Sequence, residues 1–330
     1  VNYGQDHVVI ESPGEACFDL AGVEYIKIHG FELTGAWGTG APTAGHAGAI
    51  KAFPLTPAGF GVRHSIFASN VIHHNNSGIW LTLSHHNQIV NNVVFASAEA
   101  PIRIKRGDYN TIANNLTFNN GSQERWGITF YCALGTQVYH NTSVEPSGGA
   151  VYIYEGTSNL NGAQPGDPDY CIPSNDSVVR DNIGVVTDSQ IGRSAPLVIG
   201  SSTTTDRDPL LDTLYGVLTN RFHHNLWHYA GRPGTVVSWG DLAERHTWPG
   251  YALLSLAEFQ GKATGYGLES LAEDPLFLNP RGYDFRLSTN SVAREAASDG
   301  TDMGVNFADL PYFDPYPLHR YLPLIANGLE

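Results

Sequence analysis

Short stretches in which apolar and polar residues alternate recur along the chain with a spacing of 22 to 26 residues. The stretches lie between Gly48 and Tyr154, and each is followed by a turn that contains asparagine. Alternation predicts short β-strands, and a repeat in the low twenties predicts a solenoid whose coils bury their apolar sides only by stacking. The repeat is marked by Asn70, Asn92, Asn115 and Asn141, and continues after longer insertions at Asn182 and Asn225.

The phase of the alternation predicts which side chains enter the core. In the run from Ile79 to Leu83, Ile79, Leu81 and Leu83 are expected to point inward. The same phase predicts inward positions in the neighbouring repeats at Ile50, Ala52, Ile102, Ile104, Ile128, Phe130, Val151 and Ile153. These runs are therefore expected to form parallel strands about 4.8 Å apart in one all-β parallel β-helix.

The chain of 330 residues is expected to form a single elongated domain, because a solenoid grows in one dimension. We expect coils over about residues 5–240 and a capping segment over about residues 241–330. Within that segment, Ser255 and Glu258 fit a capping box and predict a short helix from Ser255 to Gln260. This helix is expected to cover the last coils.

The asparagines at equivalent positions are expected to form a structural ladder, because a short amide can occupy a bend and bond the amide of the next coil. The pairs His73-His74, His85-His86 and His223-His224 adjoin these turns. No second ligand set lies at a matching spacing, so we expect solvated turn histidines and assign no metal ligands.

The net charge of −14 argues against a general nucleic-acid binder, which needs a broad basic surface. The sequence contains no apolar run of 18 residues, so it predicts no membrane-spanning helix. Because Val1 already belongs to a strand-like run, we expect that a signal peptide was removed and that the protein is secreted. We also expect it to be a monomer. Cys17, Cys132 and Cys171 allow one disulfide, with Cys132 and Cys171 the favoured pair, or three buried thiols.

One row of outward positions combines basic and aromatic side chains. Two of the four lysines in the chain fall on it. The row reads Lys51, Phe53, Trp80, Thr82, Arg103, Lys105, Thr129, Tyr131, Tyr152 and Tyr154. Aromatic rings offer flat faces to sugars, and an arginine fork binds carboxylate, so we expect an acidic polysaccharide to lie across the coils. Residues assigned to substrate binding are Lys51, Phe53, Trp80, Arg106, Arg125, Tyr152, Tyr154 and Glu155.

Cleavage of such a polymer by β-elimination needs a group that neutralises the uronate carboxylate, a base and an acid. Arg103 is assigned to the carboxylate, Lys105 to the C5 proton and Tyr131 to the leaving oxygen. Like charges at Arg103, Arg106 and Lys51 are expected to lower the pKa of Lys105. Tyr131 acting as both acid and base, with Lys105 purely electrostatic, stays an alternative.

The asparagine turns and the period resemble right-handed parallel β-helix proteins of the pectate-lyase-like superfamily, over about residues 20–240. The stretch from Ile104 to Ile112, followed by Ile128 to Tyr131, resembles polysaccharide lyase family six, the alginate lyase and chondroitinase B group. The resemblance implies that Lys105 is the base, while Tyr131 occupies the position of that family's arginine. Trp80 and Thr82 stand where that family holds calcium with paired acids, so calcium is left open as a cofactor.

Other functions fit the same fold. A glycoside hydrolase needs two facing carboxylates, for which Glu99, Glu124 and Glu155 are the nearby candidates. A carbohydrate-binding or surface protein without catalysis can use the same face. The basic side chains can also be ordinary surface charges paired with Glu99, Asp108 or Glu124.

Overall fold

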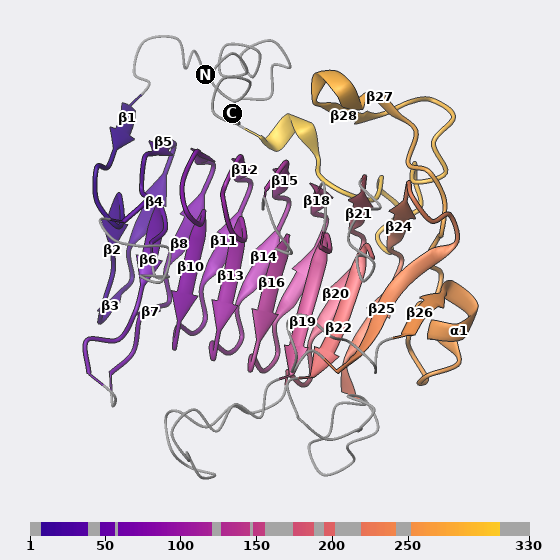
Figure 1. Ribbon diagram of the computed structural model, residues 1–330, viewed down its shortest axis with the longest axis horizontal. Helices are drawn as coiled ribbons and strands as arrows, with labels where there is room; N and C mark the ends of the chain where they lie inside the picture. The colour runs from indigo at the N-terminus through magenta and orange to yellow at the C-terminus, as the bar shows by residue number, and fades with distance from the viewer. Residues whose placement is uncertain are drawn as a thin grey trace.

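The computed structural model describes residues 8–38, 47–56, 59–120, 127–145, 148–155, 174–187, 195–201, 219–241 and 252–310. Within these residues the chain winds through three long sheets, and each full coil contributes one strand to each of them (Figure 1). All neighbouring strands of these sheets are parallel except β25 and β26. The coils thus form the parallel β-helix that the repeat predicts.

The nine-stranded sheet carries the basic and aromatic row. Its strands, in spatial order, are β2 (Phe18–Asp19), β6 (Ile50–Ala52), β10 (Ile79–Thr82), β13 (Ile102–Lys105), β16 (Ile128–Tyr131), β19 (Val151–Glu155), β22 (Leu197–Ser201), β25 (Thr235–Asp241) and β26 (Ala252–Ser255).

The other two long sheets close the coils. The eight-stranded sheet contains β1 (Val8–Glu11), β5 (Phe31–Thr34), β9 (Val71–His73), β12 (Val93–Phe95), β15 (Leu116–Phe118), β18 (Thr142–Glu145), β21 (Ile183–Val186) and β24 (Leu226–Tyr229). The seven-stranded sheet contains β4 (Lys27–His29), β8 (Ile66–Ala68), β11 (Gln88–Val90), β14 (Thr111–Ala113), β17 (Gln137–Tyr139), β20 (Val178–Arg180) and β23 (Arg221–His223). A short parallel pair, β3 (Val23–Glu24) and β7 (Val62–Arg63), lies in the first coils.

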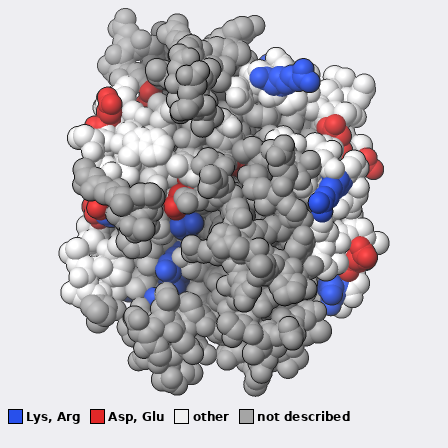
Figure 2. All heavy atoms as spheres, in the orientation of Figure 1, with Lys and Arg blue, Asp and Glu red and all other residues white. Residues whose placement is uncertain are grey.

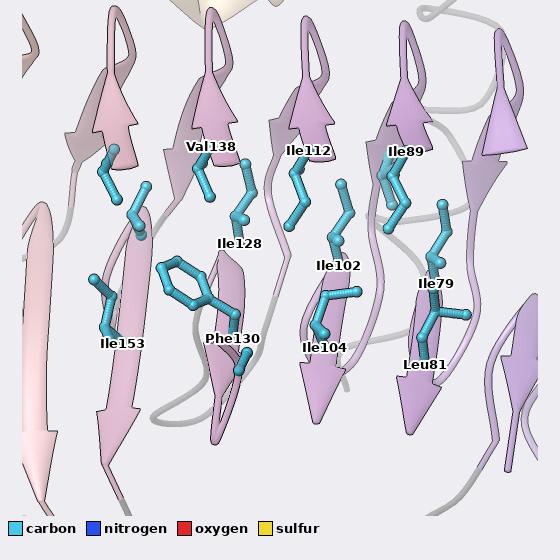
Figure 3. Close-up of a cluster of buried hydrophobic side chains, with 14 of the residues drawn as sticks. Ile79, Leu81, Ile89, Ile102, Ile104, Ile112, Ile128, Phe130, Val138 and Ile153 are labelled. Carbon is cyan, nitrogen blue, oxygen red and sulfur yellow. The ribbon is translucent and has the colours of Figure 1, made fainter. Parts of the chain in front are cut away.

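The core is a set of aliphatic stacks that run along the axis of the helix. Ile79, Ile102 and Ile128 are register partners in successive coils, and each is fully buried (Figure 3). Leu81, Ile104 and Phe130 form the neighbouring stack. The predicted inward positions are confirmed except at Leu83. Strand β10 ends at Thr82, and Leu83 takes a left-handed bend with φ of 49° that leaves it half-buried outside this core.

The asparagine ladder is confirmed, and it runs unbroken through six coils. The side-chain amide of each member donates to the side-chain oxygen of the next at 2.9–3.0 Å, from Asn70 through Asn92, Asn115, Asn141 and Asn182 to Asn225. Each amide also bonds backbone carbonyl groups, such as Ile89 O at 2.8 Å from Asn115 Nδ2. The ladder therefore satisfies buried polar groups at the bends between two sheets.

We predict that Asn115→Ala lowers the free energy of unfolding by about 3 kcal/mol, because several buried partners lose their hydrogen bonds at once. The Asn115 side chain accepts from both nitrogens of Asn92 and donates to Asn141 and two carbonyl oxygens. Urea unfolding measures the loss. The exposed Asn290→Ala is the matched control, and equal small effects in both variants would contradict a stabilising ladder.

The C-terminal segment does more than cap the end of the stack. The predicted helix is confirmed as α1 (Leu256–Gln260), with Ser255 and Glu258 making both bonds of the capping box. The chain then passes through β27 (Phe277–Asn279), η3 (Pro280–Gly282), β28 (Asp284–Leu287) and η4 (Phe307–Asp309). Figure 1 shows this last part returning along the coils, past the strands of the eight-stranded sheet.

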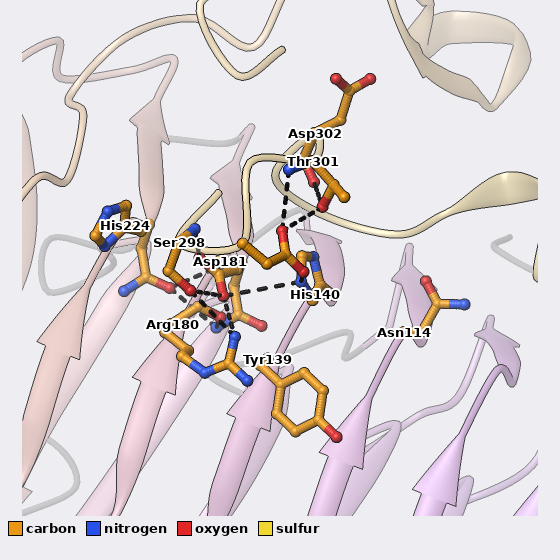
Figure 4. A network of polar contacts seen from close by, with 12 residues as sticks. Asn114, Tyr139, His140, Arg180, Asp181, His224, Ser298, Thr301 and Asp302 are labelled. Carbon is orange, nitrogen blue, oxygen red and sulfur yellow. Dashed lines mark hydrogen bonds and ion pairs between the residues drawn. The ribbon is translucent and has the colours of Figure 1, made fainter. Parts of the chain in front are cut away.

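This returning segment covers apolar side chains on the outer face of the eight-stranded sheet. Phe285, Met303 and Val305 pack there in one cluster with Phe118 and Leu116. Polar clasps fix the segment at the bends (Figure 4). The buried Asp181 carboxylate accepts from Ser298 N at 2.6 Å and Ser298 Oγ at 2.7 Å, Asn306 N donates to Asn114 Oδ1 at 2.6 Å, and His140 Nε2 lies 3.1 Å from Asp299 Oδ2.

Cys132 is disulfide-bonded, and Cys17 is a free, half-buried thiol. The expected partner of Cys132, Cys171, lies outside the described residues. No helix in the described ranges is long and apolar enough to cross a membrane.

Candidate functional site

The strand register places the predicted site residues in two rows on the outer face of the nine-stranded sheet. Trp80 pairs with Arg103, and Thr82 pairs with Lys105. One coil further, Lys105 pairs with Tyr131. Figure 2 shows Lys and Arg atoms in a short row near the middle of one face of the molecule, with Asp and Glu atoms close to it. The structure thus brings together the three residues that the sequence assigns to catalysis.

Lys105 and Tyr131 form the centre of this face. The ammonium nitrogen of Lys105 lies 5.5 Å from the centroid of the Tyr131 ring, within the range of a cation–π contact. Both side chains are half-buried. A base and an acid for the same elimination must act on neighbouring atoms of one sugar, and adjacent coils of a parallel sheet meet that requirement.

Arg103 is held from two sides. Its guanidinium carbon lies 4.5 Å from the centroid of the Trp80 ring, and Nη1 donates to Glu99 Oε2 at 3.2 Å. This pair is one of those that the alternative interpretation of the basic side chains, as paired surface charges, predicts. Its Nε is shielded from solvent and makes no hydrogen bond. At Arg286 the corresponding edge, Nε and Nη2, grips both oxygens of Asp284 at 2.8 Å and 2.6 Å.

A second buried polar atom without a hydrogen bond belongs to Thr82, the register partner of Lys105. Its Oγ1 is buried and makes no hydrogen bond. Buried polar groups without partners are uncommon in proteins and call for an explanation such as a ligand or water. Thr82 lies on β10 and Arg103 lies on β13, so the two buried atoms without hydrogen bonds, Thr82 Oγ1 and Arg103 Nε, come from adjacent strands.

Lys51 lies in an ion-pair cluster that the sequence does not predict. Its Nζ lies 2.8 Å from Glu15 Oε2 and 3.3 Å from Asp19 Oδ2. Partial burial disfavours its charge, but the hydrogen bond to Glu15 and the charge of Asp19 outweigh it and raise the pKa of Lys51. The charge of Lys51 is thus matched by two carboxylates of the first coils.

The outward aromatic residues are more enclosed than an open stacking surface requires. Trp80 keeps only 4% of its surface exposed, since Arg103 lies over its ring and Phe53 meets it edge-on at 5.1 Å. Tyr152 points outward beside Thr129 yet is 2% exposed. The outward phase is confirmed, but the expectation of exposed rings at these two positions is wrong.

Arg106 lies at the end of β13 in a left-handed bend, with φ of 53°. Its backbone N–H donates to Tyr131 O at 3.0 Å, and its side chain is buried. It is therefore part of the bend beside the central pair and not an exposed cation. Arg125 and Glu124, and the side chains of Tyr154 and Glu155, lie outside the described residues.

The histidine pairs do not share one environment. His73 is buried and lies 3.0 Å from Glu32 Oε1 through Nε2, so the expectation of a solvated histidine is wrong there. His86 is exposed, as expected, in a stack of rings with Tyr25, His64 and Tyr109. Across the described ranges, no group of three or more His, Cys, Asp or Glu side chains is arranged to hold a metal ion.

Glu15 and Asp19 are site residues that the sequence analysis missed. Asp19 is the register partner of Lys51, one coil nearer the start of the chain. Extending the outward row backward by one coil to Asp19 would have found this pairing. Glu15 lies outside any strand, so periodicity carried no signal for it.

A family model described as the right-handed beta helix region matches residues 58–162. The fold is a right-handed β-helix. No curated protein and no solved structure gives a significant match to the chain. Right-handed β-helices are common among polysaccharide-processing proteins, whereas the narrower likeness to polysaccharide lyase family six stays a prediction that rests on the residues around Lys105.

Proposed function

We propose that this β-helix is a secreted polysaccharide lyase that cleaves an acidic, uronate-containing polysaccharide on the outer face of its nine-stranded sheet. The observation that carries the proposal is the contact of Lys105 with Tyr131, at 5.5 Å, beside Arg103 on the same strand. The disulfide-bonded Cys132 fits an oxidising compartment outside the cytosol.

In the proposed reaction, Arg103 binds the carboxylate of the uronate through its guanidinium, which withdraws charge and makes the C5 proton acidic. Neutral Lys105 takes that proton. The electrons of the C5–H bond form the C4–C5 double bond, the C4–O bond breaks, and the Tyr131 hydroxyl gives its proton to the leaving oxygen. Solvent then restores both side chains.

Glu99 is a weaker candidate for hydrolysis than it was from the sequence, because it is the hydrogen-bond partner of Arg103. It serves better to hold that guanidinium in place. A hydrolase would need a second carboxylate facing it across the sugar.

The assay for this proposal is incubation with alginate, polygalacturonate and chondroitin, with and without calcium. The ultraviolet absorbance of an unsaturated uronyl end is followed, together with new reducing ends. Rising absorbance supports a lyase. Reducing ends without absorbance would indicate a hydrolase, and binding without either product would indicate a non-catalytic binder.

Tyr131→Phe is expected to lower kcat on the cleaved polymer about 100-fold or more, because the ring stays under Lys105 while the proton donor is lost. Tyr139→Phe is the matched control, since Tyr139 also lies beneath a cation, Arg180 at 4.5 Å, but on another sheet. A Tyr131→Phe enzyme within threefold of the wild-type kcat would show that another group is the acid.

A further inference from the structure

The buried position of Trp80 does not fit a role in stacking directly on sugar. The ring keeps only 4% of its surface exposed. Arg103, its register partner in the next coil, lies over the ring with the guanidinium carbon 4.5 Å from the centroid. Phe53 meets the ring edge-on, with the two centroids 5.1 Å apart. A ring covered in this way offers little surface to a substrate.

The contact with Trp80 restricts Arg103 without using its hydrogen-bond donors. An arginine that lies over an aromatic ring contacts it through the face of the guanidinium, so the N–H groups, which point in the plane, stay able to bind a carboxylate. The bond from Arg103 Nη1 to Glu99 Oε2, at 3.2 Å, would by itself let the guanidinium turn about that bond. The ring supplies a second constraint, and a group that is already ordered loses less freedom when it binds a ligand.

Resting on the proposed function, we infer that Trp80 is a positioning residue that acts on the substrate through Arg103. The ring fixes the guanidinium where the uronate carboxylate binds, and Phe53 supports the ring from the side of the first coils. Trp80 itself adds little direct contact with the sugar. The tryptophan of β10 thus belongs to the carboxylate-binding group and is not a stacking platform.

A double-mutant cycle on the polymer that the lyase assay identifies tests this role. We expect Trp80→Leu to lower kcat/KM about tenfold or more when Arg103 is present, because the guanidinium loses its aromatic support. In the Arg103→Ala background the same change should cost less than about twofold, since two residues that act through one contact are not additive. Similar losses in both backgrounds would mean that sugar contacts Trp80 directly, and they overturn the inference. An Arg103→Ala enzyme with the wild-type kcat/KM also overturns it.

Two further variants separate positioning from a general effect on the fold. Trp80→Phe keeps a ring beneath Arg103 and is expected to stay within about threefold of the wild-type kcat/KM. Trp239→Leu is the matched control, because Trp239 is also 4% exposed and lies 5.1 Å from Lys262 Nζ, but on β25, with β19 and β22 between it and β16. Its kcat/KM should stay within about twofold of wild type. A Trp80→Phe enzyme as impaired as Trp80→Leu overturns the inference.

Urea unfolding of every variant sets the conditions under which each is folded for the assay. Trp80→Met, whose flexible side chain fills the space without a ring, takes the place of Trp80→Leu if the latter does not fold. The same cycle with Arg103→Ala then applies, with the same expected results.

If no polymer yields unsaturated ends, the lyase proposal fails, and affinity electrophoresis in gels that contain alginate, polygalacturonate or chondroitin decides the inference by itself. A retardation that Trp80→Leu weakens when Arg103 is present, but not in the Arg103→Ala background, supports it. Equal losses in both backgrounds, a retardation that neither change affects, or no retardation by any of the three polymers overturns it.

Discussion

Lys105→Ala is expected to lower kcat on the cleaved polymer by about 10²- to 10⁴-fold, the usual contribution of a general base. Its side chain points away from the core, over the ring of Tyr131. The free energy of unfolding should therefore change by less than about 1 kcal/mol. Initial rates of unsaturated product, with urea unfolding on the same samples, measure both effects.

Lys105→Arg separates the two roles that the sequence leaves open. Arginine keeps the positive charge but stays protonated, so it cannot act as a base. An inactive Lys105→Arg enzyme supports the base, whereas substantial retained activity supports an electrostatic role with Tyr131 as acid and base. Lys27→Ala, an exposed lysine on the seven-stranded sheet, is the control and should keep its rate within twofold. A Lys105→Ala enzyme with most of its rate would refute the mechanism.

The second large effect is expected from Glu145, a carboxyl group buried among the coils. Burial raises its pKa from 4.5 to about 7, against hydrogen bonds from Asn120, Thr117 and Ser143. The folded protein therefore holds this proton between about pH 4.5 and 7, where the unfolded chain has released it. The resulting stability is fully present below pH 4.5 and is lost as the pH rises through about 7, by roughly 3 kcal/mol at most.

Glu145→Gln is expected to remove this pH dependence, because glutamine does not titrate in this range and its side-chain oxygen can still accept the hydrogen bond that Thr117 Oγ1 donates. Thr117 Oγ1 lies 2.9 Å from Glu145 Oε1 and 2.8 Å from Ser143 Oγ. Urea unfolding at several values between pH 4.5 and 8.5 gives the difference from wild type. The exposed Glu273→Gln is the control. A wild-type to Glu145→Gln difference that does not vary with pH would refute the raised pKa.

The rigid coil stack explains how a modest set of side chains can form a site. Arg103, Lys105 and Tyr131 lie on strands whose backbones are hydrogen-bonded to both neighbouring coils. The inward residues of these strands, such as Ile104 and Phe130, are fully buried. Groups on such elements are held more precisely than groups on loops. The position of Lys105 relative to Tyr131 is therefore a property of the register.

Much of the site was readable because register follows from the repeat. Because Ile102 and Ile104 point inward, alternation requires Arg103 and Lys105 to point outward. The parallel register of adjacent coils then places Tyr131 beside Lys105. The inward orientation predicted for Leu83 was wrong, because alternation does not indicate where a strand ends in a left-handed bend.

The sequence did not predict how deeply the outward side chains are buried. Trp80 was expected as an open platform, but its environment depends on the rotamers of Arg103 and Phe53, which lie in other coils. Lys51 looks identical to Lys105 in sequence pattern. The ion pairs of Lys51 with Glu15 and Asp19 follow only from the packing of the first coils.

By itself, the sequence determined the period, the phase of the strands, the asparagine ladder and the capping helix, because each depends on side-chain alternation or on residues a few positions apart. The tertiary structure alone decided which outward charges are matched and which faces are covered. The returning C-terminal segment shows why: Ser298 meets Asp181, and Asn306 meets Asn114, across more than a hundred residues of chain. No local pattern encodes such contacts, since they arise only when the stacked coils bring distant bends into one row.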